Sequence, residues 1–304
     1  MALSRRAVLA APAALLPAAA AAATTLKVVA SISIIADLVR QIGGARLAVT
    51  ALIGPEQDPH GFQARPSDAQ AIATADLMVI NGLGLESWAE RLAASAGYRK
   101  PGVVASRGVR PLLGGEAHHG SGGGHAHDHG AYDPHAWQDV ANVKLYTANI
   151  RDGLAAADPA GATAYAASAA AYLDRLDRLD LDIRAAFLPI PRNRRKIVTS
   201  HDAFLYYGDA YDVDFLAPQG LSTEGEPSAR DFAALIAQVR AEGIRALFIE
   251  NISRATLLEQ VARETGVRVG GTLYSDALSR ADGPAATYEA MMRHNTRLIA
   301  GALG

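Results

Sequence analysis

The sequence predicts an α/β protein with two lobes, each a mainly parallel sheet flanked by helices. Strand-like and helix-like patterns alternate along the chain, and the alternation runs twice, which is typical of parallel sheets with covering helices. The 304 residues are 50% hydrophobic, which is enough for two cores. A long helical pattern separates the two series.

The first lobe is expected over residues 24–158. Gly43-Gly44 and Gly54-Pro55 end a helix and a strand, respectively. In order, we expect a strand at 26–32, a helix at 34–42, a strand at 46–53, a helix at 66–74, a buried strand at 76–81 and a turn into another helix at 82–88.

The second lobe, expected over residues 189–304, repeats the same pattern. Gly243 and Gly266 close two of its helices. The expected strands are 196–199, 213–216, 244–250 and 267–273, and the expected helices are 228–242, 255–264 and 284–300.

Residues 159–188 are expected to form a linker helix between the lobes. Asp158 followed by Pro159 is a typical helix start, and Pro189 and Pro191 end the run. At 1.5 Å per residue the helix would be about 40 Å long, enough to cross from one lobe to the other. An ordinary amphipathic helix within one domain is the alternative. Its buried face should comprise Tyr165, Tyr172, Leu176, Leu179, Ile183 and Phe187, which recur at helical spacing.

Residues 1–23 are expected to be a cleaved secretory signal peptide. Two arginines open the segment, an apolar run follows over residues 7–16, and small residues fill 18–23. A membrane anchor is the alternative, but the segment is mostly alanine, contains two prolines and is short for a bilayer. Residues 4–9 resemble a twin-arginine export signal. Val8 stands where that pattern prefers phenylalanine, so the Sec and twin-arginine routes both stay open.

The composition limits where the protein can reside and what it can bind. With 29 Lys and Arg against 31 Asp and Glu, the net charge of −2 gives no reason to expect a nucleic acid partner. The sequence contains no cysteine, which excludes disulfides and a lipid on an N-terminal cysteine. No segment after the signal is long and apolar enough to span a membrane. A soluble bacterial periplasmic protein is the simplest interpretation.

Three histidines stand in similar settings. The tripeptide Asp-Pro-His occurs twice, and a third histidine follows the first strand expected in the second lobe. Ligands of parallel sheets bind outside the carboxyl ends of the strands, so these side chains, with a late aspartate, are expected to converge between the lobes. Three imidazoles and one carboxylate satisfy a tetrahedral zinc ion. The candidate metal ligands are His60, His135, His201 and Asp276.

Other roles for these residues stay open. A lone histidine at a strand end is more often a structural hydrogen-bonding residue than a ligand, and Asp276 could instead cap a helix opening near Ala277. Asp58 and Asp133 could support the neighbouring histidines or merely start proline turns. Glu250 is expected to cap a helix or pair between the lobes rather than to ligate. Four aromatic residues could shield a metal but more often pack in a core: Trp88, Trp137, Tyr206 and Tyr207.

A glycine-rich segment at 115–130 contains five further histidines. Its composition favours no packed core, and histidine-rich tracts bind zinc, copper or nickel weakly. We expect auxiliary metal capture there, with a neutral loop as the alternative. The histidines are His118, His119, His125, His127 and His129.

Together, five motifs resemble the zinc and manganese solute-binding proteins of ABC transporters, the ZnuA/TroA-like group, over nearly the whole chain after residue 23. The resemblance implies two α/β lobes joined by a long rigid helix, with a metal site in the cleft between the lobes. It implies His60, His135 and His201 as ligands, with Asp276 as a fourth where some members use water. Manganese members usually have a glutamate where His201 stands, and zinc members often carry a histidine-rich loop, so the resemblance favours zinc. The motifs are Gly54-Pro-Glu-Gln-Asp-Pro-His60, Asn81-Gly-Leu-Gly-Leu-Glu86 with Trp88, Asp133-Pro-His-Ala-Trp137, Ser200-His-Asp-Ala-Phe204 and Glu224-Gly-Glu-Pro-Ser228.

The function expected from this resemblance is that of a receptor, not an enzyme, which binds one Zn²⁺ tightly in the periplasm and delivers it to an ABC permease. A manganese receptor of the same family is the nearest alternative. A periplasmic metal store or chaperone and a zinc hydrolase are more distant ones. A catalytic zinc keeps a position open for water, and the sequence has no His-Glu-x-x-His helix or nucleophile elbow. We expect a monomer, with a periplasmic zinc chaperone as a further partner.

Overall fold

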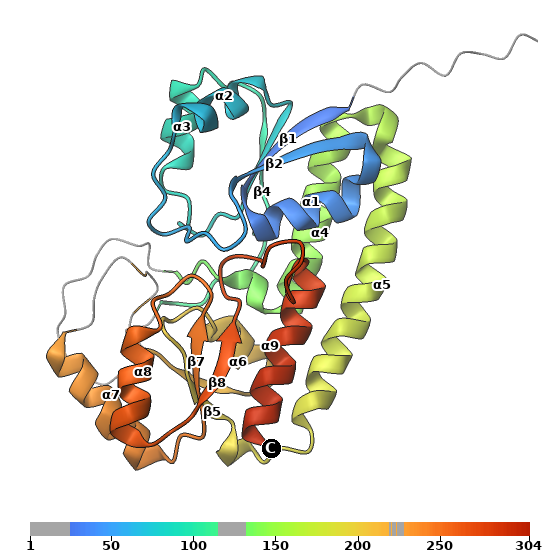
Figure 1. Cartoon of the computed structure of the whole chain (residues 1–304). Coiled ribbons are helices and arrows are strands. Elements are labelled where there is room, and N and C mark those ends of the chain that lie inside the picture. Colours follow the sequence, from blue (N-terminus) through green and yellow to red (C-terminus); the bar gives the residue numbers. More distant parts are fainter. Residues whose placement is uncertain (1–24, 115–131, 219, 221–222, 224–227) are drawn as a thin grey trace, which may run out of the picture.

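The computed structural model describes residues 25–114, 132–218, 220, 223 and 228–304. The signal segment and the histidine-rich segment expected from the sequence lie outside the described residues. Two α/β lobes lie one above the other, and a long helix runs along the side of both (Figure 1).

The first lobe contains a four-stranded parallel sheet in the order β2-β1-β3-β4. β1 is buried from Val28 to Ile32 because helices pack on the sheet, which explains its continuous run of apolar residues. The strands are β1 (Leu26–Ile32), β2 (Leu47–Ile53), β3 (Leu77–Ile80) and β4 (Gly102–Val104). The helices are α1 (Ser33–Gly43), α2 (Pro66–Thr74), α3 (Ala89–Ser95) and α4 (Val140–Ala157), with short 3₁₀ turns η1 (Gly44–Arg46) and η2 (Ala136–Gln138).

The second lobe repeats this winding in a parallel sheet with the order β6-β5-β7-β8. In both sheets the chain adds one strand to one side of the first strand and then crosses to the other side. That reversal opens a crevice at the carboxyl ends of the strands, where ligands bind in such folds. The strands are β5 (Lys196–Val198), β6 (Asp214–Leu216), β7 (Leu247–Glu250) and β8 (Val269–Leu273). The helices are α6 (Leu205–Tyr211), α7 (Ala229–Glu242), α8 (Thr256–Thr265) and α9 (Tyr288–Leu303), with the 3₁₀ turn η4 (Arg192–Arg194).

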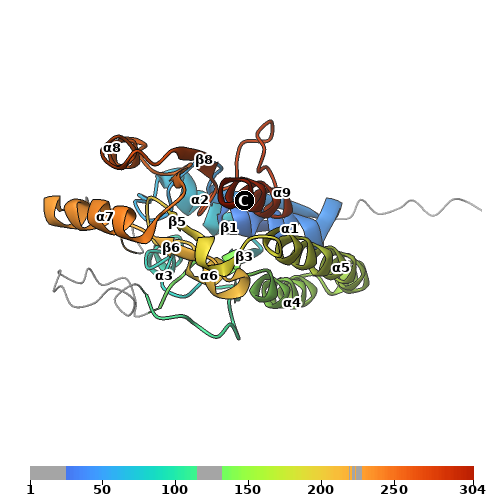
Figure 2. The same cartoon turned by 90° about the horizontal axis from the view of Figure 1, so that it is seen from below.

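The long helix is α5 (Ala162–Phe187), which packs against α1 and α4 and against α6 and α9. Figure 2 shows α4 and α5 side by side at one flank of the molecule. All six apolar residues predicted for its buried face are at most 1% exposed, so that prediction is confirmed. The helix begins later than expected because Pro159–Gly161 form the 3₁₀ turn η3. Asp158 does not cap it; its Oδ2 accepts hydrogen bonds from Arg46 Nη2 and the Tyr165 hydroxyl, both at 2.7 Å.

Several elements differ from the expectation. The last helix begins at Tyr288 rather than near residue 284. Thr287 caps this start, because its hydroxyl accepts a hydrogen bond from the Ala290 N–H at 3.2 Å. No helix opens near Ala277, so Asp276 is not a helix cap. β4 and α6 were not expected, because a three-residue strand and a seven-residue helix give too short a periodic signal.

Candidate metal centre

Four side chains from four loops meet between the lobes. His60 lies in the loop after β2, His135 precedes η2, His201 follows β5 and Asp276 follows β8. Each can offer one ligand atom such that all four atoms lie within 4.8 Å of one another. The two sheets face each other with the carboxyl ends of these strands toward the site, which is why residues up to 216 positions apart in sequence become neighbours.

The carboxylate of Asp276 lies at the middle of the cluster. Its Oδ2 is 3.1 Å from Nε2 of His60 and 3.1 Å from Nε2 of His201, and its Oδ1 is 3.3 Å from Nε2 of His135. The Nε2 atoms of His60 and His135 are 3.4 Å apart. All three imidazoles therefore turn the same nitrogen toward one point.

The cluster is buried, so polar atoms in it that lack a partner are costly. His135 and His201 are 0% exposed and Asp276 is 1% exposed, whereas His60 is partly buried. Nε2 of His201 and Oδ1 of Asp276 have no hydrogen-bond partner among the described residues, although the first lies at ion-pair distance from Oδ2 of Asp276 and the second from Nε2 of His135. An unsatisfied buried polar group costs about 1–3 kcal/mol. A divalent cation at this point would satisfy both atoms.

Two further buried carboxylates orient the histidines from behind. Asp133 Oδ1 accepts from the His135 N–H at 2.8 Å and lies 2.7 Å from His135 Nδ1. Glu250 Oε2 lies 2.7 Å from His201 Nδ1. Carboxylates in these positions hold a proton on Nδ1 and leave the Nε2 lone pair free for a metal. Asp133 thus forms a proline turn and also contacts the histidine.

Glu250 has a role that sequence reasoning missed. Its Oε1 accepts from the N–H groups of Ser200 and His201, at 2.8 and 2.9 Å, so it neither caps a helix nor pairs between the lobes. Its position as the last residue of β7 points to His201 only once β7 is known to lie next to β5, because adjacent parallel strands end at the same sheet edge.

The charged groups of the cluster shift one another's pKa values. Burial is the largest influence on His135 and His201 and would lower the pKa of each. The carboxylates outweigh it: Asp276 and Asp133 raise the pKa of His135, and Glu250 and Asp276 raise that of His201 well above its ordinary value. For Asp276, burial alone would raise the pKa, but His135 and His201 bring it well below its usual range. In the metal-free protein these shifts favour protonated His135 and His201 beside an ionised Asp276, and a metal would compete with those protons.

A second network fixes the backbone around His135. Asn81, which follows β3, donates from Nδ2 to the Pro134 carbonyl at 2.9 Å and accepts from the Tyr146 hydroxyl at 2.6 Å. Nε1 of Trp137 and Nε2 of Gln138 both donate to the carbonyl of Ser275, at 2.9 and 3.0 Å. These two bonds tie the His135 loop to the residue before Asp276.

The remaining candidates divide by position. Trp137 packs at 5.3 Å from the His135 ring and is fully buried, so it shields the cluster from water. The Tyr206 hydroxyl donates to the Asp133 carbonyl at 3.1 Å and accepts from the Leu112 N–H at 3.0 Å. The ring of Trp88 is tilted against that of Phe62, with centroids 4.4 Å apart, and Tyr207 packs in the core. The five histidines expected to capture metal lie outside the described residues: His118, His119, His125, His127 and His129.

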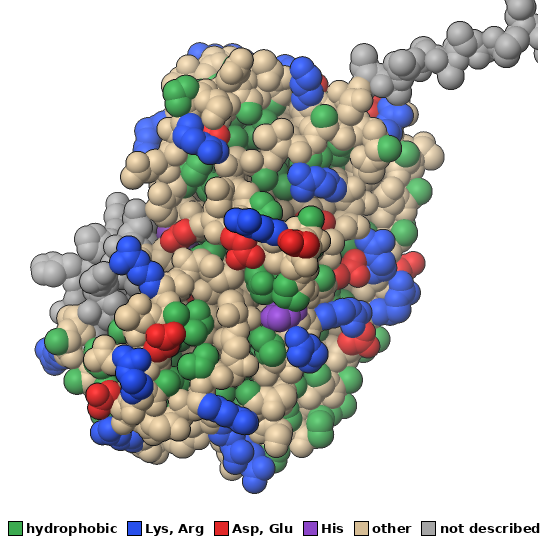
Figure 3. Space-filling model, in the orientation of Figure 1, with side chains coloured by type: hydrophobic (Ala, Val, Ile, Leu, Met, Phe, Trp, Pro, Cys, Tyr) green, Lys and Arg blue, Asp and Glu red, His purple; other side chains and the backbone are tan. Residues whose placement is uncertain are grey.

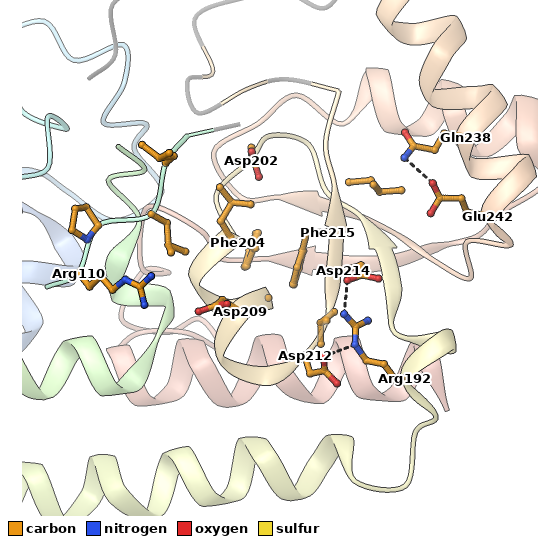
Figure 4. Close-up of a pocket in the computed structure, with 17 residues that line it drawn as sticks. Arg110, Arg192, Asp202, Phe204, Asp209, Asp212, Asp214, Phe215, Gln238 and Glu242 are labelled. Carbon is orange, nitrogen blue, oxygen red and sulfur yellow. Dashed lines mark hydrogen bonds and ion pairs between the residues drawn. The ribbon is translucent and has the colours of Figure 1, made fainter. Parts of the chain in front are cut away.

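A cavity of about 800 Å³ lies beside α6 and β6 (Figure 4). Of the cluster's neighbours it reaches only Asp202, whose pKa is raised to about 6, first by burial and then by repulsion from Asp133. Its other acids are largely paired: Arg192 contacts Asp212 and Asp214, and Glu242 accepts from Gln238 at 2.9 Å. The cavity is therefore not the metal centre.

The described residues on one face of the molecule form no patch of a single charge (Figure 3). Figure 3 shows basic and acidic side chains interspersed over one face. Among the helices of the described part of the chain, none has the length and apolar character needed to cross a membrane.

A buried set of three imidazoles and one carboxylate between two parallel-sheet lobes defines a metal-binding receptor of the solute-binding class. The family described as "Zinc-uptake complex component A periplasmic" (ZnuA) matches residues 28–302, and the chain belongs to this family.

Relatives differ in the metal that their names state. The chain is 34% identical over 278 residues to the manganese-binding lipoprotein MntA of Halalkalibacterium halodurans, which covers 91% of this chain and 88% of that protein. It is 30% identical over 285 residues to the iron ABC transporter substrate-binding lipoprotein MtsA of Streptococcus pyogenes, covering 91% and 89%. The solved periplasmic zinc-binding protein TroA of Treponema pallidum superposes with a TM-score of 0.83 at 30% identity, covering 92% and 99%. The chain is thus a metal receptor of an ABC transporter.

Proposed function

We propose that this chain captures Zn²⁺ in the periplasm and delivers it to the permease of an ABC importer. The three histidines would bind through Nε2, and Asp276 would supply one carboxylate oxygen. The convergence of these four groups within 4.8 Å carries the proposal. Zinc favours four ligands of this kind in tetrahedral array. Zn²⁺ is the cargo, so a site with all four positions filled by protein suits transport better than hydrolysis.

Manganese is the second candidate, because the Halalkalibacterium relative is named manganese-binding. Manganese prefers sites richer in oxygen ligands than this one, which offers three nitrogens. Affinity alone does not separate the two, since most sites bind zinc more tightly than manganese. Coordination geometry is the sharper criterion.

Cobalt substitution tests this proposal. Tetrahedral Co²⁺ absorbs visible light much more strongly than five- or six-coordinate Co²⁺, so we expect an intense spectrum that Zn²⁺ abolishes at one equivalent. A weak spectrum, together with manganese retained in protein purified without chelators, would support the manganese receptor instead. A competition titration of Zn²⁺ against Mn²⁺ on the same sample completes the comparison.

Stoichiometry separates a receptor from a metal store. One tight equivalent at the four-residue cluster, followed by weak binding at the histidine-rich segment, supports a receptor. Many equal sites would support storage. We assign the weak binding to His118, His119, His125, His127 and His129 on composition alone.

We further propose that residues 1–23 are removed on export and that the mature chain is a monomer free in the periplasm. Both curated relatives above are named lipoproteins, whereas this sequence contains no cysteine to carry a lipid. The proposed division is a first lobe at 24–158, a linker helix at 159–188 and a second lobe at 189–304. A periplasmic zinc chaperone is the proposed donor. Fractionation of cells, with mass analysis of the mature N-terminus, tests location and processing.

A further inference from the structure

Asn251 joins segments that carry different candidate ligands. Its side-chain Nδ2 donates to the carbonyl of Ala277, the residue after Asp276, at 3.2 Å. The same nitrogen donates to Oε2 of Glu56 at 3.2 Å. The backbone N–H of Asn251 donates to the Leu273 carbonyl at 3.0 Å, which fixes its position at the end of the sheet. One amide group therefore bridges the loop that carries His60 and the segment that carries Asp276.

Glu56 is the first-lobe end of this contact and has an unusual backbone. Its φ is +58°, a left-handed conformation that few residues other than glycine adopt. Its N–H donates to the carbonyl of Leu278 in the second lobe at 3.0 Å. Such conformations are strained and persist only where surrounding contacts enforce them. The contacts here are both with the second lobe.

His60, four residues along the same loop, is the least supported of the four candidate ligands. Its side chain is 4% exposed where those of the other three are 0%. Among the described residues its ring has no partner outside the cluster, whereas the ring of His135 contacts Asp133 and that of His201 lies at ion-pair distance from Glu250. What holds His60 is its loop, through the contacts of Glu56 and a hydrogen bond from the Thr223 hydroxyl to Asp58.

We propose that Asn251 and Glu56 are positioning residues that lock the His60 loop onto the second lobe and thereby set the rate at which bound metal leaves. The inference rests on the proposed function, because it requires His60 to be a ligand. For His60 to swing away from the ion with its loop, the contacts of Glu56 with Asn251 and Leu278 must break, as must the bond from Thr223 to Asp58. Their loss should speed metal release without removing a ligand.

The test measures release of Zn²⁺ from the loaded full chain into excess chelator by stopped flow. Asn251→Ala and Glu56→Gly should each release Zn²⁺ about tenfold faster, the usual effect of losing one hydrogen bond to a charged group. Glu56→Gly leaves the positive φ easy to adopt, so it removes the side-chain contact without adding strain. Glu56→Gln keeps an acceptor for Asn251 and should restore the rate to near that of the parent chain.

Controls and outcomes separate this inference from the function on which it rests. Asn149→Ala removes hydrogen bonds of 2.8 Å that stay within the first lobe and should leave the release rate unchanged. The double variant Asn251→Ala with Glu56→Gly should release Zn²⁺ no faster than Asn251→Ala alone, because Asn251→Ala already breaks the bond to Glu56 along with the bond to Ala277. Unchanged rates in the single variants, or effects that multiply in the double variant, would overturn the inference. If Asn251→Ala does not fold, Glu56→Gly and Glu56→Gln carry the test. A parent chain that binds no stoichiometric Zn²⁺ would overturn the proposed function and this inference with it.

Discussion

Glu250 Oε2 lies 2.7 Å from Nδ1 of His201, and both side chains are almost fully buried. The other oxygen of Glu250 accepts the N–H of His201 at 2.9 Å. One carboxylate thus fixes both the backbone and the ring of a candidate ligand. These two contacts explain how Nε2 of His201 is kept facing Asp276. They also lead to the first prediction.

Glu250→Gln should weaken Zn²⁺ binding by about 10- to 100-fold, the usual cost of losing a partner behind a metal ligand. The new amide would donate to Nδ1, which moves the ring proton to Nε2 and blocks ligation there. Calorimetric titration with Zn²⁺ measures the change. Glu242→Gln is the matched control, because Glu242 pairs with Lys196 on the surface. If Glu250→Gln bound Zn²⁺ as tightly as the parent chain, Glu250 would not be needed to orient His201 for metal binding.

The candidate ligands should matter more than their supports. His60→Ala, His135→Ala and His201→Ala each leave a closed site one ligand short, so each should weaken Zn²⁺ binding by more than about 100-fold. His294→Ala is the control; its ring contacts the Thr272 carbonyl in the second lobe. A variant whose affinity is unchanged by calorimetry would identify a histidine that does not bind the metal.

Acidity should release the metal and change what stabilises the fold. The raised pKa values of His135 and His201 stabilise the metal-free protein fully below the ordinary value of 6.5, and that contribution is lost as the pH rises through the raised values. The lowered pKa of Asp276 contributes above its ordinary value of 3.8 and is lost as the pH falls toward the lowered one. Metal binding needs neutral imidazoles, so the gain in melting temperature on adding Zn²⁺ should grow from about pH 5 to pH 8. Melting curves with and without Zn²⁺ across that range measure it, and a gain that does not vary with pH contradicts imidazole ligation.

Removing the histidine-rich segment should separate capture from tight binding. Leu113 and Tyr132 form an antiparallel bridge, which brings the two ends of the segment together. Residues 115–130 can therefore be replaced by a short turn. The shortened chain should keep one tight equivalent of Zn²⁺ but load more slowly when Zn²⁺ is scarce. Loss of the tight equivalent in titration would instead place the primary site in the deleted segment.

The fold could be predicted from local periodicity to a large extent. The apolar spacing of Tyr165 to Phe187 identified α5 because a buried helical face repeats regardless of tertiary context. The helix expected at 284 begins four residues late, since residues 281–287 form turns and bends and the Thr287 cap sets the start. Short elements such as β4 carry too few residues for any period to appear.

The candidate ligands could be found for a similar reason, since each stands just after a strand or turn signal. Asp133, two positions from His135, could be proposed as a support in the same way, but the more distant supports could not. Glu250 is 49 positions from His201, and Asn81 is 53 positions from Pro134, so neither pairing leaves a local mark in the sequence. Both depend on which strands are neighbours in the sheet, and that order emerges only from the folded structure.

Anomalous X-ray diffraction at the zinc absorption edge, from crystals grown with one equivalent of Zn²⁺, tests the central claim most directly. A single strong peak is expected at about 2.0–2.1 Å from Nε2 of His60, His135 and His201 and about 2.0–2.2 Å from one oxygen of Asp276. A peak elsewhere in the molecule, with these three nitrogens bound to no ion, would contradict the account.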